Sequence, residues 1–163
     1  MAMAIAICIR QYREGDEVAL FEIYCSAIRL VARRDYSAQQ IDAWAPRDLD
    51  SGLWRSRIRG IDPFVATLDG NPVGYADLQP TGCIDHFFVS GHHAGRGIGT
   101  RLMRHLLTEA TDQGLIELTA NVSRTAQPFF RRFGFDVIEQ RFPERQGIII
   151  PNAAMRKALV PRY

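Results

Sequence analysis

Apolar and polar positions repeat with two different periods along the chain, and this predicts both helices and strands. The apolar run from Ile5 to Arg10 is typical of a first strand, and no positive segment precedes it as in a signal peptide. Apolar residues recur at helical spacing from Leu20 to Ala27, after Asp16, a favourable helix cap. Two short helices are expected next, from Ser37 with capping-box spacing to Trp44, and from Leu53 to Ile58 before Gly60.

Strand patterns dominate the rest of the chain, with one long helix among them. Residues 98–114 carry an apolar stripe at helical spacing, and a shorter helical pattern covers 126–133. The expected strands cover residues 64–68, 73–78, 83–89, 115–120, 135–142 and 147–157, and the first two form a hairpin. Since strands and helices alternate only in part, the sequence predicts an α/β (α+β) fold with a mixed sheet and helices on both faces.

Composition narrows the class of protein. The chain has 163 residues, the size of one domain, and no linker or repeat divides residues 1–163. Its 20 basic and 18 acidic side chains leave a net charge of +2, which gives no electrostatic reason to expect nucleic acid as a partner. No apolar run reaches membrane-spanning length. Cys8, Cys25 and Cys83 are odd in number and far apart, so we expect reduced thiols and a cytoplasmic protein.

The strongest chemical signal is the junction between the strand at 84–89 and the long helix. Gly95, Gly97 and Gly99 remove every second side chain from a turn that a helix follows directly. Backbone N–H groups at a helix start lack partners and carry partial positive charge, so they bind phosphate groups. The alternative is a tight turn without a ligand. No Lys-Ser/Thr pair follows, as a P-loop requires, and the glycine spacing is not that of a dinucleotide site.

Two segments carry a resemblance to a known family. Residues Ala94-Gly95-Arg96-Gly97-Ile98-Gly99 resemble the cofactor motif Gln/Arg-x-x-Gly-x-Gly/Ala of the GNAT superfamily of acyl-CoA-dependent N-acetyltransferases, with Ala94 where the family usually has Gln or Arg. The segment from Ser123 to Phe135 resembles the family's Asn-x-x-Ala-x-x-Phe-Tyr-x-x-x-Gly-Phe. The resemblance implies a GNAT-like mixed, mostly antiparallel central sheet of about six to seven strands, and acetyl-CoA as cosubstrate without a metal.

The resemblance also implies where the cofactor lies. In the family the pyrophosphate binds the glycine turn, and the pantetheine arm lies between two splayed strands, where one N–H polarises the thioester carbonyl. For Phe129 and Phe130 the alternative is packing in the core. The cofactor residues so expected are Phe87, Phe88, Val89, Ala94, Gly95, Arg96, Gly97, Ile98, Gly99, Thr100, Asn121, Phe129 and Phe130.

The implied chemistry is direct attack of a primary amine on the thioester in a ternary complex. An alkyl amine has a pKa of about 10, so a base must take its proton. Asp85 and His86 are the candidates, although neighbours in a strand point to opposite faces unless a bulge intervenes. Phe130 stands where many members have a Tyr that protonates the CoA thiolate, so Ser123, water or another Tyr must serve.

The acceptor site is expected between Tyr24 and Trp54, on the family's first helices. Arg33, Arg34, Tyr36 and Trp44 suit a small amine that also carries a carboxylate. Alternatively, Trp44 belongs to the core and the arginines are solvated. A small metabolite, an antibiotic-like amine and a protein N-terminus or lysine all remain open as acceptors.

Other assignments compete with the enzyme. Phe130 and the unassigned base favour a non-catalytic acyl-CoA-binding or sensing module, and the glycine turn alone also fits a nucleotide- or phosphate-binding domain. Cys83, His86, His92 and His93 lie close in sequence, but no Cys-x-x-Cys or helical His pair accompanies them, so we expect no metal site. The sequence also leaves open a homodimer.

Overall fold

The computed structural model describes residues 6–160, and Ile5 of the expected first strand lies outside them. The strands are β1 (Ile7–Gln11), β2 (Phe64–Leu68), β3 (Asn71–Ala76), β4 (Cys83–Ile84), β5 (Phe87–Val89), β6 (Glu117–Ser123), β7 (Asp136–Arg141), β8 (Glu144–Arg145), β9 (Ile148–Ile149) and β10 (Asn152–Ala158). The helices are α1 (Glu17–Ser26), α2 (Ala38–Trp44), α3 (Ser51–Ile61), α4 (Ile98–Asp112) and α5 (Gln127–Arg132), with a π-helix η1 (Ala27–Val31) and 3-10 turns η2 (Ala32–Arg34) and η3 (Gly91–His93).

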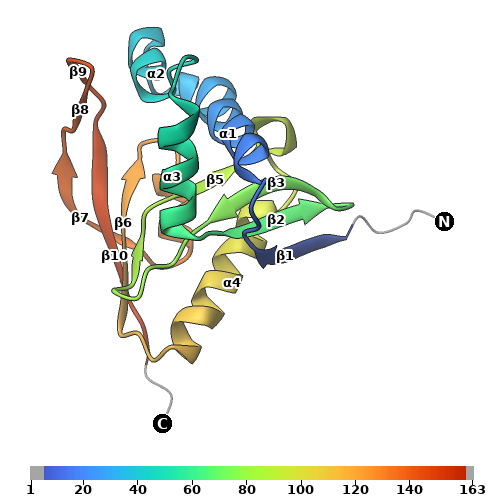
Figure 1. The fold of residues 1–163 in the computed structure, drawn as a ribbon. Helices are drawn as coiled ribbons and strands as arrows, with labels where there is room; N and C mark the ends of the chain where they lie inside the picture. Colours follow the sequence, from blue (N-terminus) through green and yellow to red (C-terminus); the bar gives the residue numbers. More distant parts are fainter. Residues whose placement is uncertain (1–5, 161–163) are drawn as a thin grey trace.

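The strands form two four-stranded sheets and a small hairpin (Figure 1). The first sheet has the order β1-β2-β3-β5 and is antiparallel throughout. The second has the order β4-β6-β10-β7, with only the β4–β6 pair parallel. The mixed, mostly antiparallel pairing is confirmed, whereas one sheet of six to seven strands is wrong because the strand expected at 83–89 is interrupted.

A buried carboxylate directly after β3 causes this interruption. Asp77, which is fully buried, accepts the backbone N–H of Asp85 at 2.8 Å and that of His86 at 2.6 Å. These two N–H groups therefore bond a side chain and not a neighbouring strand. As a result β4 pairs with β6 while β5 stays with β3, and the two sheets separate between β5 and β6.

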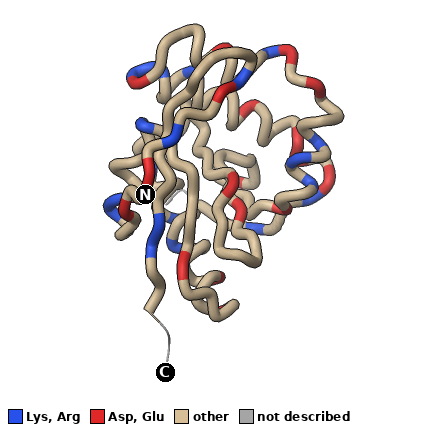
Figure 2. The backbone as a smooth tube through the Cα atoms, turned by 90° about the vertical axis from the view of Figure 1, so that its left-hand side faces the viewer, with Lys and Arg blue, Asp and Glu red and all other residues tan. Residues whose placement is uncertain are grey.

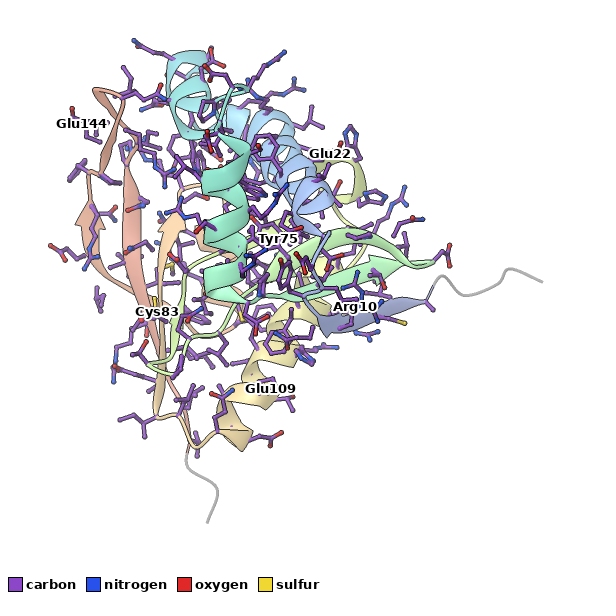
Figure 3. All side chains as sticks on the ribbon, in the orientation of Figure 1. Arg10, Glu22, Tyr75, Cys83, Glu109 and Glu144 are labelled. Carbon is purple, nitrogen blue, oxygen red and sulfur yellow. The ribbon has the colours of Figure 1, made fainter. Side chains whose placement is uncertain are left out.

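Helices cover both faces of the sheets, as expected. One core cluster lies beneath α4 and includes Leu102, Leu106 and Phe135. The other lies beneath α1 and α3, which Figure 1 shows on the opposite side from α4, and includes Tyr75 at its centre (Figure 3). Adjacent β3 residues Tyr75 and Ala76 belong to different clusters, as the two-residue period of a strand requires.

Local signals in the sequence account for several element ends. The capping box at α2 is confirmed, because Ser37 and Gln40 each accept the other's backbone N–H. Asp16 precedes α1, but its carboxylate bonds the Arg10 guanidinium at 2.8 Å and does not cap the helix. Pro151 interrupts the last expected strand and separates β9 from β10.

Charge is spread over the molecule. Figure 2 shows basic and acidic positions interspersed along the backbone. Within residues 6–160, no helix is both long and apolar enough to span a membrane.

Candidate active site

The glycine turn opens α4 with a ready set of hydrogen-bond donors. Gly95 and Gly97 have φ angles of 78° and 79°, a left-handed conformation that favours glycine. The first helical bond runs from the Arg101 N–H to the Gly97 carbonyl at 3.1 Å. The N–H groups of residues 98–100 precede it and have no helical acceptor. This end of α4 therefore offers three converging donors to an anion.

A cavity of about 410 Å³ lies in front of these donors. The glycine turn, β5, η1 and α5 form its walls. Its lining is Ala27, Ile28, Val31, Ala32, Arg34, Trp44, Phe87, Phe88, Val89, His93, Ala94, Gly95, Gly97, Ile98, Gly99, Thr100, Ser123, Thr125, Ala126, Phe129, Phe130 and Arg132. We call it the cofactor cavity. Every residue expected at the cofactor lines it except Arg96, which is exposed, and Asn121.

The strand β5 presents a free edge to this cavity. The bond from the Asp77 N–H to the His86 carbonyl and that from the Ser90 N–H to the Val73 carbonyl fix the register of β5 on β3. Antiparallel pairing then directs the Phe88 N–H to β3, and those of Phe87 and Val89 to the opposite side. Because β6 pairs with β4 instead of β5, these two donors face the separation between the sheets.

The wall of the cofactor cavity that η1 forms lies close to the glycine turn. The π-helix η1 contributes Ala27, Ile28 and Val31 to the cofactor cavity. Such π-helical segments are rare and often occur at functional sites. The Gly91 N–H donates to Ser26 Oγ at 3.0 Å, and a Cβ at Gly91 would collide with the Ser26 carbonyl oxygen. This close approach fixes the position of α1 and η1 relative to the turn.

A second cavity of about 410 Å³ lies on the other side of β5. Its lining is Tyr24, Tyr36, Trp44, Arg57, Asp85, His86, Phe88, Asn121, Ser123, Arg141, Pro143, Arg145, Ile150 and Asn152. We call it the acceptor cavity. Trp44, Phe88 and Ser123 line both cavities, and they also line a small cavity of about 60 Å³ between them. The two large cavities therefore meet at these three side chains.

The strand is interrupted at Asp85 and His86, which is the exception under which neighbouring side chains need not point to opposite faces. Both line the acceptor cavity, because the hydrogen bonds to Asp77 break the regular strand at these two residues. Asp85 is exposed and also lines the small connecting cavity, whereas His86 is 6% exposed. The break thus brings both candidate bases to one site.

The surroundings of His86 favour an uncharged ring with a defined proton. Its pKa is lowered from 6.5 to about 4, chiefly by burial; Asp85 opposes this shift, and Arg57 and Arg145 add to it. Its Nδ1 lies 3.0 Å from the hydroxyl of Tyr75, a fully buried side chain. A Tyr75 hydroxyl that donates to Nδ1 satisfies the buried O–H and leaves the His86 proton on Nε2. His86 then presents a hydrogen-bond donor to the cavity, and neither ring nitrogen is free to take a proton from an amine.

We expect His86 to make folding stability depend on pH. Between pH 6.5 and 4 the unfolded chain binds a proton at this residue and the folded chain does not, so stability falls as pH drops through this range and is fully present above it. The contribution is about 3 kcal/mol. Urea unfolding at pH 7 and pH 4 should show a smaller pH-dependent loss in His86→Gln than in wild type, since the titrating carboxyl groups cancel in the comparison. Equal losses would contradict a neutral buried His86.

The remaining catalytic and cofactor candidates take different places. Ser123 accepts the Ala126 N–H at 3.2 Å, which leaves its own O–H available at the junction of the cavities. Phe130 packs in the core, with 3% of its surface exposed, and also lines the cofactor cavity. Asn121 lines the acceptor and connecting cavities, and Arg141 donates to its Oδ1 at 3.1 Å.

The acceptor residues expected from the sequence are only partly together. Trp44 and Tyr36 line the acceptor cavity, while Arg34 lines the cofactor cavity. Arg33 is exposed and lines neither, because η2 directs it outward. The Tyr36 hydroxyl is already used, since it donates to the Pro151 carbonyl at 2.5 Å and accepts the Arg124 N–H at 2.9 Å.

The arginines that do line the acceptor cavity were missed. Arg57, Arg141 and Arg145 come from α3, β7 and β8. Nothing local in the sequence marks them, because arginines are scattered along the whole chain and no motif surrounds these three.

Cys83, His86, His92 and His93, for which no metal site was expected, do not share one element. Cys83 lies in β4, His86 between β4 and β5, and His92 and His93 in η3. In the described part of the chain, no three His, Cys, Asp or Glu side chains are placed to hold a metal ion.

Known proteins are similar to this chain in sequence, and solved structures are similar to it in fold. Residues 32–159 match the family model of the Acetyltransferase (GNAT) domain. The uncharacterized N-acetyltransferase YafP of Escherichia coli (strain K12) is 34% identical over 150 residues, which cover 92% of this chain and 95% of that protein.

Solved structures agree. The GCN5-related N-acetyltransferase (Aminotransferase, Class-II) from Rhodopseudomonas palustris has a TM-score of 0.90 at 30% identity, with 98% of this chain and 100% of that chain covered. The PaiA N-acetyltransferase from Thermoplasma acidophilum, solved with coenzyme A, shares the fold with a TM-score of 0.71 at 17% identity over 95% of this chain and 100% of that chain. From the family match over most of its length and the relative that is 34% identical, the chain belongs to the GNAT family of N-acetyltransferases.

Proposed function

We propose that this protein transfers an acetyl group from acetyl-CoA to a primary amine by direct attack in a ternary complex. The observation that carries this proposal is the meeting of the cofactor and acceptor cavities at Trp44, Phe88 and Ser123. Two substrates bound in these cavities would have their reacting ends side by side, so no acyl-enzyme is needed.

The glycine turn and β5 would bind the acyl donor. The N–H groups of residues 98–100 receive the pyrophosphate at the start of α4. The free N–H groups of Phe87 and Val89 receive the pantetheine arm, and one of them donates to the thioester oxygen, where negative charge develops. When bound, acetyl-CoA supplies a carbonyl carbon that is open to attack.

Asp85 would act as the general base. The amine nitrogen forms the new bond to the carbonyl carbon, the carbon–sulfur bond breaks, and its electron pair leaves with the sulfur. Asp85 lines both the acceptor and the connecting cavity, where it would take the proton that the amine loses. The Ser123 hydroxyl, at the same junction, would donate a hydrogen bond to the leaving thiolate and relay to it the proton that Asp85 took from the amine, as Phe130 has none to give.

Replacing Asp85 with asparagine tests this proposal. We expect kcat to fall by about 10²- to 10⁴-fold, the usual contribution of a general base, while acetyl-CoA still raises the melting temperature. Release of CoA thiol with a set of primary amines measures turnover. Asp69→Asn, an exposed carboxyl in the β2–β3 turn, is the control and should keep wild-type kcat.

Other results separate the alternatives. Unchanged kcat in Asp85→Asn would contradict its role as base. Loss of the acetyl-CoA effect in that variant would give Asp85 a structural role. If wild type binds acetyl-CoA but releases no thiol with any amine, the protein is an acyl-CoA-binding module. An equal thermal effect of ADP would favour a general phosphate-binding domain.

A further inference from the structure

We propose that the acceptor cavity selects small amines that carry an anionic group, a carboxylate or a phosphate, held between Arg57 and Arg145. This inference rests on the proposed function, because it names the class of acceptor for the same site. It gives the role that the sequence suggested for Arg33 and Arg34 to residues of α3 and β8, both of which line the acceptor cavity.

The charged side chains of the cavity are unbalanced. Arg57, Arg141 and Arg145 line it against a single carboxylate, Asp85. A concave site lined by one sign of charge focuses its potential and attracts ligands of the opposite sign. Guanidinium groups also match the geometry of carboxylates and phosphates, to which they donate two hydrogen bonds at once.

Two of these cations are not neutralised by the protein. In residues 6–160 no carboxylate pairs with Arg57 or Arg145, whereas Arg141 pairs with Glu139 at 3.3 Å and also bonds Asn121. The charges of Arg57 and Arg145 reach the same wall of the cavity, since both lower the pKa of Tyr24 and of His86. A ligand anion between them would supply the missing negative charge.

The amine and the anion of such a ligand would lie at different ends of the cavity. Asp85 lines the small connecting cavity as well as the acceptor cavity, so it marks the end nearest the cofactor. The three arginines line only the acceptor cavity. An ammonium group near Asp85 and an anion near Arg57 and Arg145 therefore orient the amine toward the thioester.

The lining of the acceptor cavity also includes a polar atom without a hydrogen-bond partner among the described residues. This atom is the buried Oδ1 of Asn152. A buried acceptor without a partner costs free energy that a ligand N–H would recover. His86, with its proton on Nε2, adds a donor on the wall where the effects of Arg57 and Arg145 converge.

The walls favour a small acceptor over a protein chain. The β8–β9 hairpin lies against α2 (Figure 1), where Gln40 Nε2 donates to the Ile149 carbonyl at 3.0 Å. The Tyr36 hydroxyl bonds the Pro151 carbonyl directly after the hairpin. Pro143 and Ile150, at the two ends of this hairpin segment, complete the cavity wall. The cavity volume of about 410 Å³ is in the range of small-molecule sites.

Matched pairs of amines test this inference. O-Phosphoethanolamine is compared with ethanolamine, and 4-aminobutyrate with 4-aminobutanamide, and a short peptide with a free N-terminus is added. Acetyl-CoA-dependent thiol release gives kcat/KM, and calorimetry in the presence of CoA gives binding without turnover. We expect the anionic member of at least one pair to be favoured about tenfold or more, mainly through KM. The phosphate and carboxylate pairs show which anion fits.

Variants show whether the arginines cause the preference. Arg57→Gln and Arg145→Gln should each reduce the ratio between anionic and neutral partners by about tenfold. Arg55→Gln, an exposed residue of the same helix that lines no cavity, should leave the ratio unchanged. The inference would be overturned if the neutral amine of every pair had a kcat/KM equal to or higher than that of its anionic partner, or if the peptide were preferred. It would also be overturned if the substitutions of Arg57 and Arg145 left the ratio unchanged, or if no amine in the set showed anion-dependent binding.

The two proposals fail in different ways. Turnover of amines without any anion preference supports the proposed function and overturns the inference. Arginine-dependent binding of an anionic amine without thiol release supports the inference and contradicts catalysis.

Discussion

Replacing Gly97 with aspartate is expected to abolish the stabilisation of this protein by acetyl-CoA. Aspartate tolerates a left-handed conformation better than most residues, and Gly97, with φ 79°, is the cap of α4. Its carboxylate would take the N–H groups that precede the first helical bond and would repel the pyrophosphate. With acetyl-CoA at a hundred times its dissociation constant, the free energy of unfolding of the wild type should rise by about 2.7 kcal/mol. Its melting temperature should rise by about 5 to 11 °C. The variant should gain nothing while remaining folded.

A second glycine separates this effect from backbone strain. Gly70, in the β2–β3 turn, has φ 82°, and a Cβ there, as at Gly97, would meet no atom within 4 Å. Gly70→Asp should therefore lose a similar amount of stability and keep the full response to acetyl-CoA. A wild-type response in Gly97→Asp would mean that the start of α4 does not bind the diphosphate.

Removing the carboxylate of Asp77 should damage both the fold and the reaction. In Asp77→Ala the N–H groups of Asp85 and His86 lose their acceptor in a buried place, at a cost of about 2 to 6 kcal/mol. With the break no longer fixed, Asp85 loses its position at the junction of the cavities, and a displacement of about 1 Å lowers kcat about 100-fold. Urea unfolding and thiol release measure the two effects. Asp77→Asn retains one acceptor oxygen and should lose less on both measures.

Glu17 supplies a control for the loss of stability alone. It is 5% exposed and accepts hydrogen bonds from the Tyr12 hydroxyl at 2.5 Å and the Gly15 N–H at 2.8 Å, but it lines neither cavity. Glu17→Ala should lose stability and keep wild-type kcat. If Asp77→Ala behaves in the same way, Asp77 supports the fold without positioning Asp85.

In the proposed reaction, the break at Asp85 and His86 would serve both substrates. It leaves the edge of β5 unpaired, where the acyl donor would bind, because β4 pairs with β6. It also brings both polar side chains into the acceptor cavity. A regular strand at 83–89 would close the separation between the sheets and direct one of the two side chains away from the site.

Features that arise from residues close together in the sequence could be predicted without the structure. The stripe from Ile98 to Ala110, the capping box at Ser37 and the glycine turn are local patterns, in which the residues that interact lie within about one helical turn. For this reason the helices, the hairpin and most of the cofactor cavity were predictable from residues alone, and the order of elements was sufficient for a mixed sheet. The family resemblance rested on the same local segments.

Only the tertiary structure decided the features made by residues distant in sequence. Asp77 interrupts a strand eight and nine residues later through its side chain, and no local period records such a bond. Arg57 and Arg145 line one cavity although they come from α3 and β8, while Arg33, close to the expected site in sequence, is exposed and lines neither large cavity. Side-chain direction at these positions follows from packing between elements, which the order of residues alone does not specify.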